Sequence, residues 1–533
     1  MKARPFLAVV LASLMALLAI AGTAWWWVLA HSPLQLQHQS LAMPLAARFV
    51  PRQAPLSLFV FSDGRQLEGY ARAVAPSRHR RQAVAAVAAL RDGAFAAAGL
   101  DYASELAGWL APETGLALLA DSADAPPNGW LLSLRSRDPE GARRFVQRFW
   151  QTRSLAGTDL QVSSYRGMGL ISGRGGLVGQ PSQPLATALI NDDLVLIASG
   201  RGVLEQALDV SQIDELNQAA NPAFQASLRE LGQGVALISA RPQALEPWFW
   251  PGTTGVVAAL RPEGATLTVE ARIELADGAT AGPAAIPPAT PDGPAAASLL
   301  QAYRGDADSL ALLQSPAEWG LPLQALLQRV LAAESGSMPA LVAAADHGPL
   351  LWAQGPLGWQ LGSPAHNPDP EQLQDTLRAA GLVEAPLQLQ GQTVQVWTRL
   401  AAITPAAVRK QRGDSDPSLQ ATLLGAHTLP AAGGADTPVW WAQTLAVLAE
   451  QLQQRQPPRQ RLNQLEALGA PQALLRWAVA GAPARELLQQ WQPWQLLSGL
   501  AGQPLGEAAQ GLALAVEPDG GQLLLKARLQ FDG

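Results

Sequence analysis

The chain has 533 residues, of which 48% are hydrophobic, and a formal net charge of −6 at pH 7. This mild negative charge argues against a nucleic-acid partner, because such partners select clustered positive charge. The sequence contains no cysteine, which excludes disulfides, thiolate catalysis, cysteine-ligated metal centres and a lipid attached to cysteine. The length allows two to four domains.

The first element is a long apolar run, Phe6–Ala30, which we expect to form one transmembrane helix. At about 1.5 Å of rise per residue, the run is longer than the roughly 30 Å hydrocarbon core of a bilayer. Lys2 and Arg4 precede it, so the N-terminus is expected in the cytoplasm and the body outside. The alternative is a cleaved signal peptide, although the apolar region of such peptides is usually only about 7–15 residues long.

A first α+β unit is expected over residues 45–277, after a membrane anchor at 1–30 and a Gln-rich tether at 31–44. Leu56–Phe61 is predicted to be a buried strand, and the Ala-rich segment Pro76–Leu110 is predicted to be helical.

Helix and strand signals are clearest between residues 130 and 199. Asp138-Pro139-Glu140 supplies a capping residue, a proline suited to the first helical turn and an early acid. The apolar residues that follow, through Trp150, recur at the spacing of one buried helix face. Leu185–Ile190 and Leu194–Ser199 flank a turn and predict a hairpin.

The segments Gly255–Leu275 and Gly511–Phe531 align without a gap and both predict a closing antiparallel hairpin. A second triplet, Asp369-Pro370-Glu371, repeats the helix start in the same order. The alignment makes Glu270 the counterpart of Lys526, and this charge reversal favours a repeated shape over a repeated charged site. The identical residues of the two hairpins are Gly511, Ala515, Pro518, Gly520, Leu523, Ala527 and Arg528 in the second copy.

These matches predict an internal duplication. The second α+β unit is expected at 297–533, after a Pro-rich linker at 278–296, with a helical, Trp-bearing insert at about 440–500. The predicted fold is therefore α+β: one N-terminal transmembrane helix, then two tandem related domains with mainly antiparallel sheets.

The body resembles the DUF3352 family in its opening Ala47-Arg48-Phe49-Val50-Pro51 with Ala54-Pro55, its Asp-Pro-Glu helix starts and its repeated closing hairpins. That family consists of uncharacterised, membrane-anchored proteins that are common in cyanobacteria. The resemblance implies a body in the periplasm or the thylakoid lumen, and it implies no established activity and no catalytic residue.

Two features favour contact with a partner. Arg78, Arg80 and Arg81 form a basic cluster at a predicted helix start, where the helix dipole disfavours cations, so they are candidates for lipid head groups or an acidic partner. Trp491 and Trp494 are candidates for an exposed docking patch. The alternatives are a solvated helix end for the arginines and core packing for the tryptophans.

No motif assembles catalytic, cofactor-binding or metal-binding chemistry. The histidines show no ligand spacing, and Asp346-His347, the one acid–histidine neighbour pair, is interpreted as loop polarity. We therefore expect a non-enzymatic, single-pass membrane protein that binds or assembles with another protein, and the sequence does not set its oligomeric state. The alternatives are a lipid or pigment carrier with an apolar cavity of several hundred Å³, and an exported hydrolase built around His79, His347, His366 or His427.

Overall fold

The structure is a computed structural model of the chain, and it describes residues 32–531 apart from short gaps. The gaps are residues 123–124, 155–159, 176–182, 245–251, 277–292, 333–336, 366, 404–417, 430–436, 454–458, 492–493, 496–497, 500–501 and 503–504. The expected membrane helix, Phe6–Ala30, lies outside the described residues. Among the residues that are described, no helix is both long and apolar enough to cross a bilayer.

The strands of the described chain form one 20-stranded sheet. Those of the first half are β1 (Leu56–Val60), β2 (Leu110–Leu119), β3 (Gly129–Ser136), β4 (Gln161–Tyr165), β5 (Met168–Gly175), β6 (Gln183–Ile190), β7 (Leu194–Ala198), β8 (Ala236–Ala240), β9 (Thr253–Glu263) and β10 (Thr266–Leu275). Those of the second half are β11 (Ser309–Gln314), β12 (Pro349–Gly355), β13 (Gly358–Ser363), β14 (Val383–Leu389), β15 (Gln392–Ile403), β16 (Ser418–Thr428), β17 (Val439–Ala442), β18 (Leu475–Ala480), β19 (Ala509–Asp519) and β20 (Gln522–Phe531).

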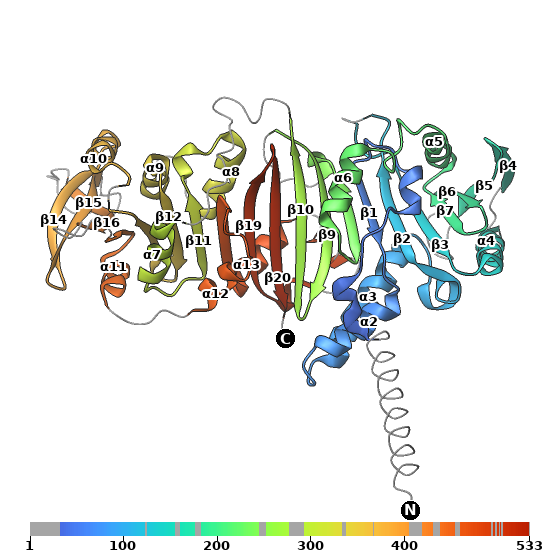
Figure 1. Cartoon of the computed structure of the whole chain (residues 1–533), viewed down its shortest axis with the longest axis horizontal. Helices are drawn as coiled ribbons and strands as arrows, with labels where there is room; N and C mark the ends of the chain where they lie inside the picture. The colour runs from blue at the N-terminus through green and yellow to red at the C-terminus, as the bar shows by residue number, and fades with distance from the viewer. Residues whose placement is uncertain are drawn as a thin grey trace, which may run out of the picture.

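The pairings are all antiparallel and give one strand order for each half. The first half runs β4-β5-β6-β7-β3-β2-β1-β8-β9-β10 across the sheet. The second half repeats this order with every strand number raised by ten, from β14 to β20. The halves meet where β10 pairs with β20. Figure 1 shows the resulting long sheet, with β4 and β14 at its two ends and the β10–β20 seam in the middle.

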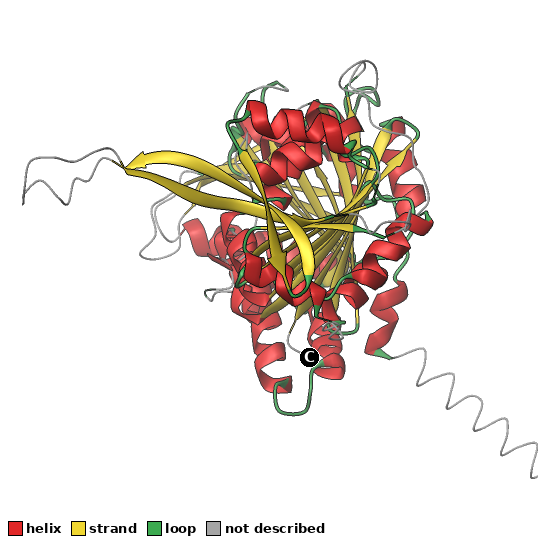
Figure 2. Cartoon of the chain, turned by 90° about the vertical axis from the view of Figure 1, so that its left-hand side faces the viewer, coloured by secondary structure: helices red, strands yellow, loops and turns green. Residues whose placement is uncertain are grey.

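Helices cover both faces of this twisted sheet (Figure 2). The α-helices of the first half are α2 (Gly64–Val74), α3 (Arg80–Ala97), α4 (Pro139–Ser154), α5 (Arg201–Ser211) and α6 (Pro222–Leu231). Those of the second half are α7 (Pro294–Ala302), α8 (Leu321–Val330), α9 (Met338–Ala345), α10 (Pro370–Ala379), α11 (Leu445–Leu452), α12 (Gln460–Glu466) and α13 (Gly481–Gln490).

Both Asp-Pro-Glu triplets start helices, as the sequence predicted. α4 begins at Pro139 and α10 at Pro370, where a proline loses no hydrogen bond because first-turn N–H groups have no partner within the helix. The Asp369 side chain caps α10 by accepting a hydrogen bond from the N–H of Glu371 at 3.0 Å. The repeated signal therefore places one helix at the same point of each half.

The core lies on both faces of the sheet. Alternate residues of β7 enter different clusters: Leu194 and Leu196 pack on one face, whereas Val195 and Ile197 pack on the other. A strand buried on both faces carries a continuous apolar run, and each such side chain contributes roughly 1.5–3 kcal/mol on burial. One cluster of the second half continues across the seam to Val256 and Ile273 of the first.

The seam has a local two-fold relation. Glu270 of β10 lies directly opposite Lys526 of β20, and these are the two residues that the alignment of the hairpins makes equivalent. Each also has an ion-pair partner in its own half, Arg261 at 3.5 Å and Glu517 at 2.9 Å, and these two are likewise equivalent. Charges therefore alternate in sign across four strands, in the order Arg261, Glu270, Lys526, Glu517.

A second pair of contacts ties the halves together. Arg272 of the first half contacts Asp519 of the second at 2.7 Å, and Arg528 of the second contacts Glu263 of the first at 3.3 Å. The same alignment relates the two arginines to each other and the two acids to each other. The seam is therefore crossed by two matching ion pairs.

Two features differ from the expected organisation. The halves share one sheet instead of forming separate sheets, because β10 and β20 pair along their lengths. The segment at about 440–500, expected to be a helical insert, contains β17 and β18, which occupy the sheet positions of β7 and β8. These strands have only four and six residues, and α11, α12 and α13 lie next to them in the chain, so the helical signals dominate the sequence pattern there.

Candidate functional site

A stack of aromatic rings lies in the second half, on β15, β16 and β17. The ring of His427 lies 4.1 Å from that of Trp441 and 6.3 Å from that of Trp397, centroid to centroid, with both pairs near parallel. His427 and Trp441 are directly opposite in the β16–β17 pairing. The stack therefore follows from cross-strand neighbours that the sheet brings together.

The His427 ring is buried and uncharged. Its Nδ1 lies 3.0 Å from the carbonyl oxygen of Thr428, and since that oxygen only accepts, Nδ1 carries the hydrogen. Burial lowers the pKa of His427, against the opposing effect of this hydrogen bond. The ring is therefore neutral at pH 7, which leaves Nε2 free to act as an acceptor.

A cavity of about 100 Å³ lies beside the stack. Its wall includes the three rings, residues of the loop that leads to α10, and Leu373 and Gln374 of α10 itself. The indole N–H groups of Trp397 and Trp441 are buried without a hydrogen-bond partner among the described residues. A buried donor without an acceptor is unfavourable by roughly 1–3 kcal/mol. The cavity therefore lies beside two tryptophans whose indole N–H groups are buried without a partner among the described residues.

In the first half, side chains fill the position that corresponds to this cavity. The β6–β7 pairing puts Thr187 opposite Ile197, as the β16–β17 pairing puts His427 opposite Trp441. Both first-half residues are at most 1% exposed. The indole of Trp150, from α4, donates to the Thr187 hydroxyl at 2.7 Å. The counterpart position is therefore packed and its indole N–H is satisfied.

The helices explain this difference. α4 has 16 residues and packs Phe145, Phe149 and Trp150 into the core, whereas α10 has only 10 residues. Aligned on the Asp-Pro-Glu triplets, the α10 counterparts of those three aromatics are Thr376, Ala380 and Gly381. In the second half the large aromatic side chains therefore lie on the strands instead of on the helix. The shorter helix leaves the space beside their rings unfilled.

Asp346 is a second feature that the sequence misjudged. It was expected to be loop polarity, but it is completely buried between α9 and β12. Its Oδ1 accepts a hydrogen bond from the N–H of Gly348 at 2.8 Å, while Oδ2 has no partner among the described residues. Burial raises the pKa of Asp346 well above its usual value. Burial therefore favours the neutral form of this side chain.

The five residues predicted for contact lie in two places. Arg78, Arg80 and Arg81 are exposed at the turn into α3. Trp494 is only 7% exposed and packs with Leu488, and Trp491 is half-buried against the same cluster. The two tryptophans therefore pack in the core, which was the alternative to an exposed docking patch. No contact in the described part of the chain joins them to the arginines.

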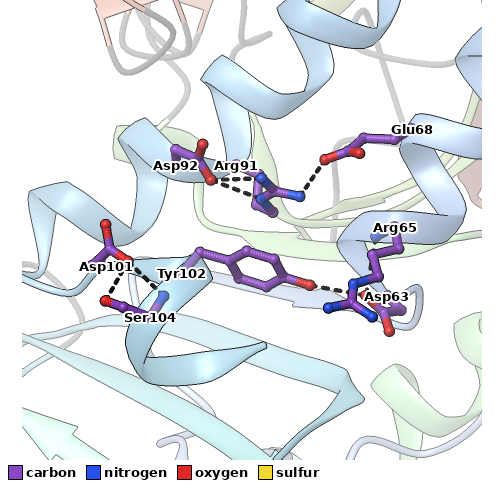
Figure 3. Close-up of polar contacts among 8 residues, drawn as sticks. All are labelled: Asp63, Arg65, Glu68, Arg91, Asp92, Asp101, Tyr102 and Ser104. Atoms are coloured by element: carbon purple, nitrogen blue, oxygen red, sulfur yellow. Dashed lines mark hydrogen bonds and ion pairs between the residues drawn. The ribbon is translucent and has the colours of Figure 1, made fainter. Parts of the chain in front are cut away.

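Polar contacts fix the base of the hairpin that α2 and α3 form (Figure 3). Arg91 of α3 contacts Glu68 of α2, pairs with Asp92 at 2.8 Å and lies 4.0 Å over the ring of Tyr102. The Tyr102 hydroxyl donates to Asp63, which caps α2, at 2.9 Å. Burial, followed by the contact with Asp63, raises the pKa of Tyr102 to about 12. The cluster therefore holds α2 and α3 in one orientation.

Among the described residues, no hydrogen bond joins a histidine named for a hydrolase to an acid or a serine. His347 is exposed and 3.8 Å from Glu318, His79 precedes α3, and His366 lies outside the described residues. Over the same described ranges, no three His, Asp or Glu residues gather closely enough to hold a metal ion.

Sequence reasoning did not find Trp397, His427 and Trp441 as a group. They are 14 to 44 positions apart, and only the strand pairing places them together. The signal within the sequence was the short α10, which supplies less bulk than α4.

Comparison with known proteins gives a family and a distant likeness. The family described as "Protein of unknown function (DUF3352)" matches residues 10–279. No curated protein matches the chain. Crystal forms I and III of TP0453 match at 10% and 11% identity, each with a TM-score of 0.27, over 54% and 55% of this chain and 86% and 87% of that one. Because the family model matches half of its length, the chain belongs to the DUF3352 family.

Proposed function

We propose that this is a membrane-tethered binding or assembly protein, with its N-terminus in the cytoplasm and its body in the periplasm or thylakoid lumen. We further propose that a partner protein is bound at the cavity beside His427. The apolar run Phe6–Ala30 supports the tether. The observation that carries the binding role is an aromatic-lined cavity beside two unpartnered indole N–H groups, at a position that the other half fills.

The wall of the cavity indicates the chemistry of its guest. Flat rings favour contact with a flat group, and a small shift of either indole would present its buried, unpartnered N–H to an acceptor on the guest. At roughly 30 Å³ per water molecule, about 100 Å³ holds on the order of three waters or one short side chain. A partner side chain with a planar, oxygen-bearing end group, such as an amide or a carboxylate, meets these requirements.

The volume favours a side chain over a whole lipid or pigment. The carrier alternative requires an apolar cavity of several hundred Å³. The cavity beside His427 has about 100 Å³, and another, lined by Tyr303, Asp306 and Glu450 among others, has about 180 Å³. Within the described residues these spaces suit small groups.

We also propose that the two halves arose by duplication and then diverged, with one half keeping a packed core and the other acquiring the binding position. The repeated strand order and the two-fold register of the seam support this origin. Only the first half and the residues before it are covered by the DUF3352 match.

Site-specific photo-cross-linking tests the binding role, and the absence of cysteine makes single-site labelling straightforward. The full chain carrying Gln374→Cys, with a photoreactive label, is irradiated in its native membrane. The matched control is Gln147→Cys, on the corresponding helix α4 of the packed half. We expect one partner protein to be captured stoichiometrically from position 374 and not from position 147.

A cavity-filling variant makes the test specific. Ala365 is 4% exposed and lines the cavity, so Ala365→Leu places three more carbon atoms in it. Capture from position 374 should disappear in this variant while the protein stays folded. Capture that survives Ala365→Leu, or that is equal from positions 374 and 147, would refute binding at the cavity.

A further inference from the structure

The hairpin of α2 and α3 projects from the body. Figures 1 and 2 both show these helices extending beyond the lower side of the sheet. Burial in the hairpin is slight, because Tyr70 is the one fully buried residue of α2 and the described α3 has none. Its tip, residues 76–81, is therefore a surface feature and not a part of the core.

The tip is strongly basic. Residues 69–90 contain four arginines and no acid: Arg72, Arg78, Arg80 and Arg81. All four are exposed, and none forms an ion pair within the described residues. Elsewhere on the surface, Arg143 and Arg201 have acidic partners on or near their own helices. The hairpin therefore presents positive charge that the protein itself does not neutralise.

This charge lies where the chain enters the body from the expected membrane helix. The first described element, η1 (Pro33–His38), packs on α2: Gln37 Nε2 donates to the Tyr70 hydroxyl at 3.0 Å, and Pro33 lies against Gly69. Only a few residues separate Pro33 from the end of Phe6–Ala30. A bilayer that holds this run therefore lies within a short reach of the hairpin.

We propose that the tip of the α2–α3 hairpin contacts the phosphate groups of anionic phospholipids and so orients the body on the membrane. The inference rests on the proposed tether. Arginine suits this contact because its planar guanidinium binds two phosphate oxygens at once. The helix dipole disfavours cations at the start of α3, so an external anion is the group that stabilises them there. The Arg91 cluster at the base keeps the tip pointing outward.

The experiment measures the distance of the tip from the lipid surface in the full chain. Ser77→Cys, at the exposed tip, carries a fluorophore, and the protein is inserted into nanodiscs that contain head-group nitroxide quencher. One set of discs is pure phosphatidylcholine and the other contains about one third phosphatidylglycerol. Ser164→Cys, on the end strand β4, is the control label.

We expect quenching at position 77 to be stronger in the anionic discs, to fall in high salt, and to be absent at position 164. Arg78→Gln, Arg80→Gln and Arg81→Gln together should weaken the contact by roughly fivefold per arginine. The control replaces Arg148, Arg174 and Arg229, three exposed arginines elsewhere, by glutamine and should leave quenching unchanged.

Two failures are distinguishable. A chain that does not enter the discs at all refutes the tether. A chain that enters them but shows the same quenching in both lipids, or no loss in the triple tip variant, refutes the lipid contact. The second result, combined with chemical cross-linking from position 77 to an acidic protein, would assign the tip to that protein.

Discussion

The two halves of the sheet differ in where they keep their aromatic side chains. In the first half, α4 inserts Phe145, Phe149 and Trp150 into the core, and the strand residues beneath them are aliphatic apart from Trp130 of β3. In the second half, the strands carry Trp397 and Trp441, and the shorter α10 leaves a cavity over them. The same strand order therefore supports a sealed core in one half and an open position in the other.

The largest expected effect compares one tryptophan from each half. Trp150→Leu leaves a void in a packed core and removes the donor to Thr187, so we expect a loss of about 3 kcal/mol in the free energy of unfolding. Trp441→Leu also removes bulk, but it eliminates an unpartnered N–H, so its cost should be smaller by about 1 kcal/mol or more. Urea denaturation measures both values. Equal losses would contradict the distinction between the halves.

The next effect concerns the two matching ion pairs of the seam. Arg272 is 15% exposed and contacts both Glu230, at 2.6 Å, and Asp519, so Arg272→Ala should cost about 2 kcal/mol. Arg528→Ala should cost less than about 1 kcal/mol, because Arg528 is 28% exposed and its contact with Glu263 is longer. Calorimetry of both variants tests this order, and a larger loss for Arg528→Ala would reverse it.

Asp346 gives a pH-dependent contrast, because the first half buries no acid among its described residues. Its folded pKa is raised, so the unfolded chain ionises above about pH 4 while the folded chain stays protonated. The contribution of Asp346 to stability is therefore full at acid pH and lost as the pH rises toward the folded pKa. Asp346→Asn should match the wild type in free energy of unfolding near pH 4 and be more stable than the wild type at pH 8. A constant difference in urea denaturation at both pH values would exclude this account.

The smallest effect tests the alternating charges of the seam. Lys526→Glu places an acid opposite Glu270 and beside Glu517, and it should cost about 0.5 kcal/mol more than the neutral control Lys526→Gln. The difference should shrink in 1 M salt because these groups are partly exposed. Thermal unfolding at two salt concentrations measures it. If the excess cost of Lys526→Glu is the same at both salt concentrations, it arises from packing and not from charge.

The local elements were predictable because their signals are local. The Asp-Pro-Glu triplets and the alternating pattern of Gly255–Leu275 predicted helix starts and a hairpin that the structure contains. The mixed α+β class with a large antiparallel sheet followed from these patterns.

Contacts between distant segments were not predictable from one sequence. The pairing of β10 with β20 joins residues about 250 positions apart, and no local pattern specifies it. The burial of Trp494 and Asp346 depends on what packs over them, which composition does not reveal. The cavity depends on the length of α10 relative to α4 and becomes visible only when the two halves are superimposed in register.

The seam also restricts how the protein can be divided. A fragment that ends shortly after β10 would uncover a strand edge with Leu267 and Val269 along it. Self-association of two such fragments in the register of the seam would bring Glu270 against its own copy, with no lysine to meet it. The charge reversal between Glu270 and Lys526 therefore favours pairing of the two halves over self-association of fragments, by a small margin.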